Sequence, residues 1–283
     1  MVAPRVFWLG SGEAHMGDLP EAWEVWAQST FEPTLPNACR AVLSPFTVSW
    51  TESPDFETAQ GAAARVHPID EAARRWAFSF EYFRAEYDAD AQHIEVEVGP
   101  ANDPQLTLAN VLRFCVSLRL PLESKGLMLH ASSGGLARGV VFAGVSTAGK
   151  STLSLGFEGV EYYSDDISLV TFDDDNVWLT GSPFYGLYGK RGVQKRVPLA
   201  AFCLLSKSDD DVTHVQRLNK SQALAQSLRH VVSFSDSPVL AQALLDQLAR
   251  LVEAVPFFSV VRSLQTPSDD VFAQVMTAVE EAA

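Results

Sequence analysis

The chain has 283 residues, a length that suggests one large domain or two small ones. Hydrophobic residues make up 47% of the sequence and charged residues 20%, so the composition is that of a globular protein and excludes a disordered chain. The formal net charge is −14, which argues against a protein that wraps nucleic acid or lies on an anionic membrane surface, because both need a surplus of cations. Neither nucleic acid nor a membrane is therefore expected as a partner.

The cysteines and the apolar runs bear on the compartment. Cys39, Cys115 and Cys203 lie far apart and form no CxxC pair, so we expect reduced thiols and neither a disulfide framework nor a zinc site. The first apolar run, residues 6–9, is too short for the core of a signal peptide, and no run approaches the ~18 apolar residues of a membrane span. The sequence therefore predicts a cytoplasmic protein.

The first part of the chain has its own charge pattern and predicted elements. Residues 1–120 hold 8 Arg, no Lys and 17 acidic residues, a net charge of −9, whereas residues 121–283 have a net charge of −5. Alternating apolar residues predict strands, and apolar residues three or four apart predict helices. A small α+β domain is expected over residues 1–120, with helices at 21–29 and 105–120, strands at 47–50, 76–82 and 93–98, and a hairpin turn at 88–91.

From residue 126 onward strands and helices are mixed, which predicts an α/β fold, a mixed sheet with flanking helices, for the domain over residues 121–283. Short continuous apolar runs predict buried strands, and a turn is expected at 132–138. The expected strands are 127–131, 139–144, 161–164, 167–172, 177–180, 200–205 and 257–263, and the expected helices are 151–157, 221–230 and 239–255.

One motif between these elements is specific for phosphate. The run Gly144-Val-Ser-Thr-Ala-Gly149-Lys150-Ser151 fits the P-loop pattern G-x-x-x-x-G-K-[ST], with a hydrophobic strand before it and a predicted helix after it. Glycines let the loop curl so that its N–H groups point at phosphate oxygens, the lysine reaches the β- and γ-phosphates, and the next hydroxyl ligates Mg²⁺. The predicted nucleotide-binding residues of this segment are Gly144, Ser146, Thr147, Ala148, Gly149, Lys150, Ser151 and Thr152.

The ligand of this loop is predicted to be a nucleoside triphosphate with Mg²⁺. A guanine-binding N-K-x-D motif needs an aspartate that the run Asn-Lys-Ser-Gln at 219–222 lacks, and the LSGGQ-like signature of ABC-type ATPases is absent. ATP is then the expected cofactor, by elimination.

A pair of carboxylates follows the loop. Asp165 and Asp166 come fifteen and sixteen residues after Lys150, which leaves room for a short helix and one strand that returns to the phosphate end of the sheet. One carboxylate can hold Mg²⁺, and the other can accept a proton from an attacking hydroxyl. A turn or a helix cap is the alternative for such a pair. His130, in the strand before the P-loop strand, is either a core or edge residue or a partner that tunes the pKa of the catalytic carboxylate.

Four cations gather near residue 190. Lys190, Arg191, Lys195 and Arg196 follow a segment at 184–189 that is rich in glycine and tyrosine. A loop of this kind can close over a triphosphate and neutralise charge in the transition state, so Lys190 and Arg191 are included among the predicted nucleotide-binding residues. A solvated surface loop is the alternative.

Several segments together resemble a known family. The runs Leu-His-Ala-Ser at 129–132 and Tyr-Ser-Asp-Asp at 163–166, with the strand and P-loop over 140–152 between them, are similar to the C-terminal domain of HPr kinase/phosphorylase, whose nucleotide core is shared with PEP carboxykinase. The run Gly-Ser-Pro-Phe-Tyr-Gly at 181–186 resembles a GTPF-x-G segment of an HPr-kinase-related branch. The resemblance covers residues 125–275.

This resemblance implies a fold and a set of roles. The fold would be a P-loop core like that of PEP carboxykinase and HPr kinase, with the small N-terminal α+β domain added to it. Gly144–Ser151 would cradle the phosphates of ATP. Asp165 would be the general base that activates an acceptor hydroxyl, Asp166 would engage Mg²⁺ together with Ser151, and His130 would be the partner of Asp165.

Three departures from the family pattern bear on the substrate. Thr147 stands where relatives commonly place a loop glycine. The basic-acidic signature loop by which HPr kinases handle HPr and run the reverse phosphorolysis is not recognisable, so the acceptor is not identified. The oxaloacetate and manganese sites of PEP carboxykinase are not recognisable either, so carboxykinase activity is not expected. Residues 1–120 resemble no family that we can name and are expected to serve substrate choice or assembly.

Taken together, these features predict an ATP- and Mg²⁺-dependent kinase that transfers the γ-phosphoryl group to a hydroxyl, of the serine type, on a protein or peptide acceptor. Two alternatives stay open: a nucleotide-binding regulatory protein without transfer chemistry, and a kinase of a free serine-type metabolite. A homo-oligomer is compatible with the sequence, which does not decide the oligomeric state.

Overall fold

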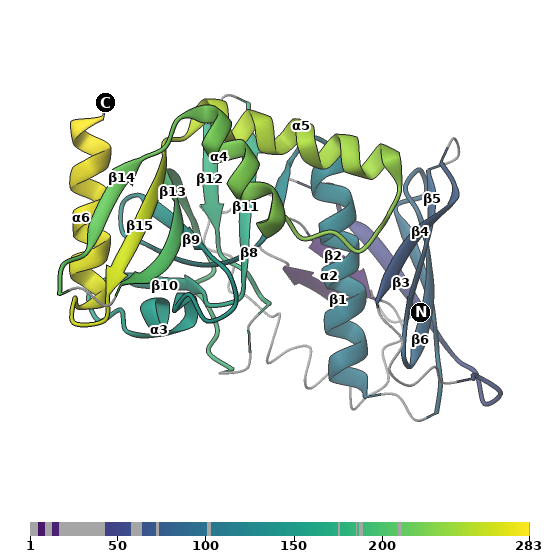
Figure 1. Cartoon of the computed structure of the whole chain (residues 1–283). Helices are drawn as coiled ribbons and strands as arrows, with labels where there is room; N and C mark the ends of the chain where they lie inside the picture. Colours follow the sequence, from purple (N-terminus) through teal and green to yellow (C-terminus); the bar gives the residue numbers. More distant parts are fainter. Residues whose placement is uncertain are drawn as a thin grey trace.

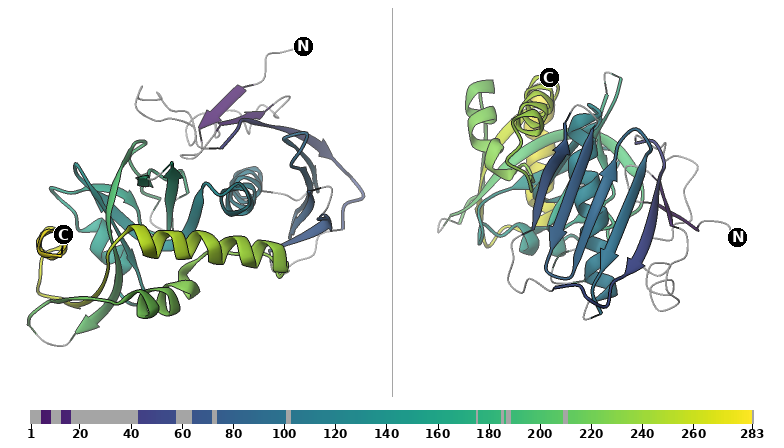
Figure 2. Two further views of the ribbon diagram at one scale, coloured as in Figure 1. Left: turned by 90° about the horizontal axis from the view of Figure 1, so that it is seen from above. Right: turned by 90° about the vertical axis from the view of Figure 1, so that its right-hand side faces the viewer.

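The computed structural model describes residues 5–8, 13–16, 43–57, 64–71, 74–100, 103–174, 176–184, 186, 189–208 and 211–282. It is a mixed α/β structure with two sheets, and a long helix lies between them (Figures 1 and 2). The helix predicted at 21–29 lies outside the described residues. Among the described residues, no helix is long and apolar enough to cross a membrane.

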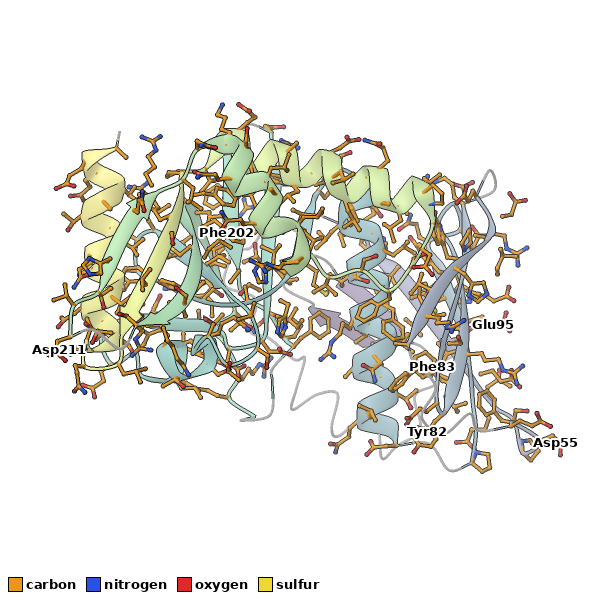
Figure 3. All side chains as sticks on the ribbon, in the orientation of Figure 1. Asp55, Tyr82, Phe83, Glu95, Phe202 and Asp211 are labelled. Carbon is orange, nitrogen blue, oxygen red and sulfur yellow. The ribbon has the colours of Figure 1, made fainter. Side chains whose placement is uncertain are left out.

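The N-terminal sheet has seven strands in the order β1-β2-β3-β7-β6-β5-β4 and curves around the helix, as Figure 2 shows. In β6 and β7 buried and exposed residues alternate, because one face packs on the core and the other meets solvent. Figure 3 shows both faces: Phe83 lies between sheet and helix, and Glu95 points outward. The strands are β1 (Arg5–Trp8), β2 (Glu13–Met16), β3 (Phe46–Glu52), β4 (Arg65–Asp70), β5 (Arg75–Phe80), β6 (Phe83–Asp88) and β7 (His93–Val98).

Helix α2 (Pro104–Leu122) joins the two halves of the molecule. It begins at Asp103, whose side chain accepts hydrogen bonds from the N–H groups of Gln105 and Leu106, and proline occupies the first turn, where its missing N–H has no cost. The helix packs against β6 on one side and against β8 on the other, so apolar residues are buried all around it. One continuous hydrophobic cluster runs from the N-terminal sheet through α2 into the second sheet, and the predicted boundary at residue 120 falls inside this helix.

The second sheet has eight strands, and its strands are mostly buried on both faces. The first half of β8 pairs with β11, and its second half pairs with β9 and β10, so β8 continues to Gly135 and only residues 136–138 of the turn predicted at 132–138 form the turn. Strand β13 is parallel to both β9 and β15. The strands are β8 (Gly126–Gly135), β9 (Gly139–Ala143), β10 (Glu161–Ser164), β11 (Ile167–Asp173), β12 (Asn176–Thr180), β13 (Arg196–Ser208), β14 (His214–Arg217) and β15 (Phe257–Ser263).

Helices cover this sheet, and the last of them along the chain, over residues 268–281, was not predicted. The helix expected at 221–230 is divided into α4 (Lys220–Ser227) and the 3₁₀ turn η1 (Leu228–His230). Helix α5 (Pro238–Ala254) runs along α2, and α6 (Ser268–Glu281) packs on β13 and β14 with a second apolar cluster beneath it. The short helix α3 (Lys150–Leu155) follows the loop after β9. The strand–loop–helix arrangement expected for the phosphate motif is therefore present.

Candidate active site

The loop of residues 144–149 joins β9 to α3. A Cβ atom on Gly144 would lie 2.6 Å from the carbonyl oxygen of Leu205 in β13, so only glycine lets the loop leave the sheet at this point. Gly149 has a φ of 92° and begins α3. Thr147 also lies in the left-handed region, with a φ of 73°, a conformation that a β-branched residue adopts at a cost. The threonine that departs from the family pattern is thus held in a glycine-like conformation.

Lys150 lies at the centre of the loop. Its side chain is buried, and its ammonium donates hydrogen bonds to the carbonyl oxygens of Gly144 at 2.9 Å and Val145 at 3.4 Å. Burial lowers the pKa of Lys150, and the charge of Asp166 partly offsets this. The ammonium is therefore held inside the curve of the loop, within the electrostatic influence of the second carboxylate.

Asp165 lies in the short turn between β10 and β11 and is only 2% exposed. Its Oδ1 accepts hydrogen bonds from the hydroxyl of Tyr162 at 2.7 Å and from the N–H of Gly186 at 3.1 Å. A Cβ on Gly186 would lie 2.9 Å from Oδ2, so glycine is required for this close approach. The hydroxyl of Ser151 donates to the carbonyl oxygen of Asp165 at 3.4 Å, which ties the loop to the carboxylate pair.

Asp166 has a different environment, in which three basic groups act on it. His130 Nδ1 lies 3.1 Å from Asp166 Oδ1, and both side chains are partly exposed. The pKa of Asp166 is lowered, and the largest cause is the hydrogen bond from His130. Burial acts in the opposite direction and raises this pKa, and the charges of His130, Arg113 and Lys150 lower it further. These groups come from β8, α2 and α3, and they keep Asp166 in its charged form.

The partner of His130 is therefore Asp166, and the expectation that it pairs with Asp165 is wrong. The reason is the register of β8 and β11, in which His130 lies opposite Ile167, and the N–H of Ala131 donates to the carbonyl oxygen of Asp166 at 3.0 Å. This register brings the second carboxylate beside the imidazole. His130 is exposed in a strand that is otherwise buried, so the interpretation as a core residue does not hold either.

The four cations near residue 190 do not form one cluster. Lys195 forms an ion pair with Glu161, and Arg196 pairs with Asp173 at 3.1 Å and lies over the ring of Trp178. Arg196 belongs to strand β13. Lys195 and Arg196 therefore have structural partners, whereas the binding of a nucleotide by Lys190 and Arg191 stays a prediction.

Lys190 lies nearer to the carboxylate pair. Its ammonium is 4.5 Å from the centre of the Tyr162 ring, and its carbonyl oxygen accepts a hydrogen bond from the Tyr162 hydroxyl at 3.2 Å. The same hydroxyl donates to Asp165. Arg191 is partly buried next to it. The segment that contains Lys190 is thus connected to Asp165 through a single tyrosine.

Two basic residues near the site were not among the residues predicted from the sequence. His230 in η1 is 4% exposed, and its pKa is lowered to about 4, first by burial and then by the charges of Arg229, Lys150 and His130. Arg113 in α2 has a pKa lowered by burial, which the charge of Asp166 offsets in part. No local motif marks either residue, because the chain brings them to the site only through the packing of α2 and η1 on β8.

A magnesium ion would find suitable donors here. Mg²⁺ prefers hard oxygen ligands and commonly takes one or two from the protein and the rest from water and phosphates. The hydroxyl of Ser151 and the charged carboxylate of Asp166 are such donors. Within the described ranges no group of three or more His, Cys, Asp or Glu residues could hold a metal by itself.

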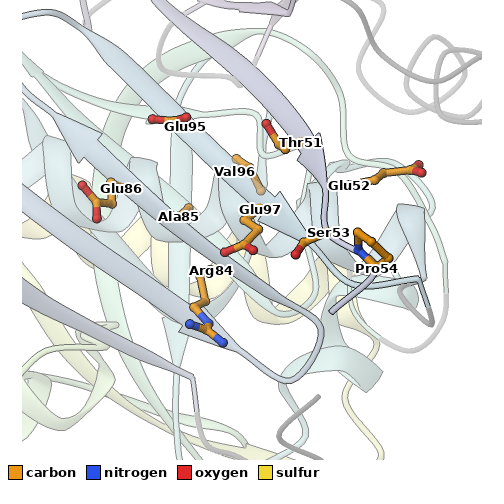
Figure 4. A pocket seen from close by; sticks show the side chains of 10 residues that line it. All are labelled: Thr51, Glu52, Ser53, Pro54, Arg84, Ala85, Glu86, Glu95, Val96 and Glu97. Carbon is orange, nitrogen blue, oxygen red and sulfur yellow. The ribbon is translucent and has the colours of Figure 1, made fainter. Parts of the chain in front are cut away.

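A separate hollow lies on the outer face of the N-terminal sheet, away from the carboxylate pair (Figure 4). Its volume is about 460 Å³, and acidic side chains from neighbouring strands surround a single arginine. The lining residues are Thr51, Glu52, Ser53, Pro54, Arg84, Ala85, Glu86, Glu95, Val96 and Glu97.

Comparisons with known proteins do not identify a family for this chain. No family model matches the chain, and no curated protein matches it in sequence. Among solved structures, the HPr(Ser) kinase/phosphatase from Coxiella burnetii is similar with a TM-score of 0.32 and 11% sequence identity, over 55% of this chain and 96% of that chain. A similarity of this size carries no conclusion about the fold, the activity or the substrate of this chain.

Proposed function

We propose that this protein is a phosphotransferase that uses ATP and Mg²⁺ to phosphorylate a hydroxyl group, of the serine type, on a protein or peptide acceptor. The observation that supports the proposal is that the loop and the carboxylate pair lie close together. The charge of Lys150 lowers the pKa of Asp166, and the hydroxyl of Ser151 donates a hydrogen bond to the carbonyl oxygen of Asp165. These residue types at one place match the needs of phosphoryl transfer, which are positioning and charge neutralisation.

The loop supplies the binding half of this activity. The Lys150 ammonium, bonded to carbonyl oxygens of its own loop, would exchange them for the β- and γ-phosphate oxygens of ATP. Ser151 and Asp166 would hold Mg²⁺, which when bound neutralises charge on the phosphates. His130, bonded to Asp166, would fix the orientation of that carboxylate.

The two carboxylates would divide the chemistry according to their neighbours. Asp166 is surrounded by cations, which favour the charged form and make it a weak proton acceptor. Asp165 accepts hydrogen bonds from neutral donors, a hydroxyl and a backbone N–H, and is the better candidate for a general base. In the transfer, the bond from the γ-phosphorus to the bridging oxygen breaks and ADP leaves with the electron pair. The acceptor oxygen forms the new bond and gives its proton to Asp165.

The test is transfer of label from [γ-³²P]ATP to proteins of a cell extract and, separately, to free serine. We expect a labelled protein band with wild type and a rate about 10³-fold lower with Asp165→Asn, since general acid–base catalysis contributes 10² to 10⁴. ATP binding should survive in that variant. Asp246→Asn, an exposed carboxylate in α5, is the matched control and should transfer label at the wild-type rate. Wild-type transfer by Asp165→Asn contradicts the assignment of the base, and label on serine alone contradicts a protein acceptor.

One observation favours a second candidate, a nucleotide-binding regulatory protein without transfer chemistry. Asp165 is 2% exposed, and the backbone of Gly186 lies against its carboxylate, so an acceptor hydroxyl reaches it only if that backbone shifts. Binding of ATP with neither transfer nor hydrolysis, measured on the purified wild-type protein, would support this candidate over the kinase.

A further inference from the structure

Arg113 is a cation in the apolar helix α2, beside the ring of Phe184 and under the influence of the charge of Asp166. Its Nε atom is buried without a hydrogen-bond partner among the described residues. The guanidinium carbon lies over the ring of Phe184, 5.7 Å from its centre, a cation–π contact. A buried donor without a partner destabilises the folded state, so a retained one calls for an explanation.

The position of Arg113 connects it to the carboxylate pair. Phe184 lies two residues before Gly186, whose N–H donates to Asp165. Helix α2 also packs on β8, the strand that carries His130. Arg113 therefore reaches the site from the N-terminal half of the molecule, whereas the loop reaches it from the second sheet.

The charges around Arg113 indicate what it would bind. Asp166, the carboxylate that acts on Arg113, is already bonded to His130 and under the influence of Lys150. The site thus holds more basic groups than its one accessible carboxylate needs, in a chain whose net charge is −14. Guanidinium groups bind phosphate oxygens through two parallel N–H bonds, which suits a planar fork with spare donors.

We propose that Arg113 binds the phosphoryl group while it is transferred from ATP, and that helix α2 thereby supplies a catalytic residue to the site of the second sheet. This rests on the proposed kinase function. The guanidinium donates hydrogen bonds to the equatorial oxygens of the γ-phosphoryl group as its bond to ADP breaks and its bond to the acceptor oxygen forms. Arg113 takes no proton and forms no covalent bond; the proton of the acceptor goes to Asp165.

The experiment compares wild type with Arg113→Met and Arg113→Lys by thermal unfolding. The probes are Mg²⁺·ADP and Mg²⁺·ADP with aluminium fluoride, which takes the place of the transferred phosphoryl group. We expect the unfolding temperature of wild type to rise with Mg²⁺·ADP and again with aluminium fluoride. Arg113→Met should keep the first rise and lose the second, Arg113→Lys should keep part of it, and the transfer rate of Arg113→Met should fall about a hundredfold. Arg84→Met, which removes an exposed arginine that also lies over a phenylalanine ring, is the matched control and should behave as wild type.

The unliganded proteins separate a catalytic role from a structural one. Removal of a buried donor that has no partner should leave the unfolding temperature of Arg113→Met unchanged or raise it. A marked fall without ligand, a second rise kept by Arg113→Met, or a wild type that binds Mg²⁺·ADP without a second rise each overturns the inference. A wild type that binds no Mg²⁺·ADP overturns the proposed function itself, and the inference with it.

Discussion

Helix α2 carries two arginines with buried nitrogen atoms, and the two regions that they face supply them with different numbers of hydrogen-bond partners. Toward the N-terminal sheet, Arg119 Nε donates to Glu123 at 2.6 Å and Nη2 donates to Gln92 at 2.7 Å, with the rings of Phe46 and Tyr87 against the guanidinium. Toward the second sheet, Arg113 meets one aromatic ring, and its buried Nε has no partner in the described chain.

If Arg113 binds the phosphoryl group as proposed, this difference separates an arginine that completes a core from one that binds a ligand. The N-terminal region satisfies two donors of Arg119 with its own residues, although Nη1 is buried without a hydrogen-bond partner among the described residues. Burial lowers the pKa of Arg119, but Cys115 and Tyr87, and then Glu123, outweigh this and raise it. The second region collects basic groups around a single accessible carboxylate and lowers the pKa of Lys150, Arg113 and His230. Substitutions in the first region should therefore change stability, and those in the second should change binding and transfer.

The largest effect is expected at the loop. Lys150→Met should lower the rate of phosphoryl transfer by about 10³-fold or more, because charge on the transferring group is then no longer neutralised by the ammonium. The variant should keep the far-ultraviolet circular dichroism of wild type. Lys220→Met removes an exposed ammonium that pairs with Glu253 and is the control for a lost lysine. If Lys150→Met transfers label as fast as the control, the proposed role of Lys150 and its loop in phosphoryl transfer is contradicted.

The next effect concerns the structural arginine. Arg119→Met leaves Glu123 without its cation and should lower the free energy of unfolding by about 3 kcal/mol, the range found when one partner of a buried ion pair is removed. Arg113→Met should change it by less than about 1 kcal/mol. Urea unfolding at 25 °C gives both values. Equal losses of unfolding free energy in the two variants would contradict the proposed difference between the two arginines of α2.

The parts of the site that lie in one segment of chain could be predicted from the sequence. The loop of residues 144–149 and Lys150 are consecutive in the sequence, and the aspartate pair lies in one turn. Arg113 could not be predicted, because on the sequence it is a polar residue in an apolar helix, and only the packing of α2 against Phe184 gives it a role. The pairing of His130 with Asp166 likewise depends on the register of two strands.

The missed elements have equally particular causes. Strand β6 was not predicted: residues 83–87 lie between the strand predicted at 76–82 and the turn predicted at 88–91, because the actual turn at residues 81–82 contains neither glycine nor asparagine. Helix α6 carried a signal that could have found it: Val271, Val275 and Val279 are buried four residues apart. Most strands of the second sheet were found, since strands buried on both faces have continuous apolar sequences.

The third effect is a dependence of folding stability on pH that arises from His230, one of the basic residues near Asp166. His230 takes up a proton near its ordinary pKa of 6.5 in the unfolded chain, but only at about pH 4 in the folded protein. Between these values the unfolded state binds more protons, so the stability should fall as the pH is lowered from 6.5 toward 4, by roughly 2 kcal/mol. His230→Gln should flatten this decline, and His214→Gln, at an exposed site in β14, should not. Urea unfolding at several pH values measures it; a slope unchanged in His230→Gln would show that other groups cause the dependence.

The smallest effect tests the loop conformation itself. Thr147 has a φ of 73°, where a β-branched residue is strained and glycine is not, so Thr147→Gly should raise the free energy of unfolding by about 1 kcal/mol. Part of the gain is cancelled because glycine also increases the freedom of the unfolded chain. Thr147→Ala keeps a Cβ and therefore most of the strain, and it should gain less than the glycine variant. If alanine stabilises as much as glycine, the cause lies in the threonine side chain and its packing, and the left-handed backbone of the loop is not the source of the strain.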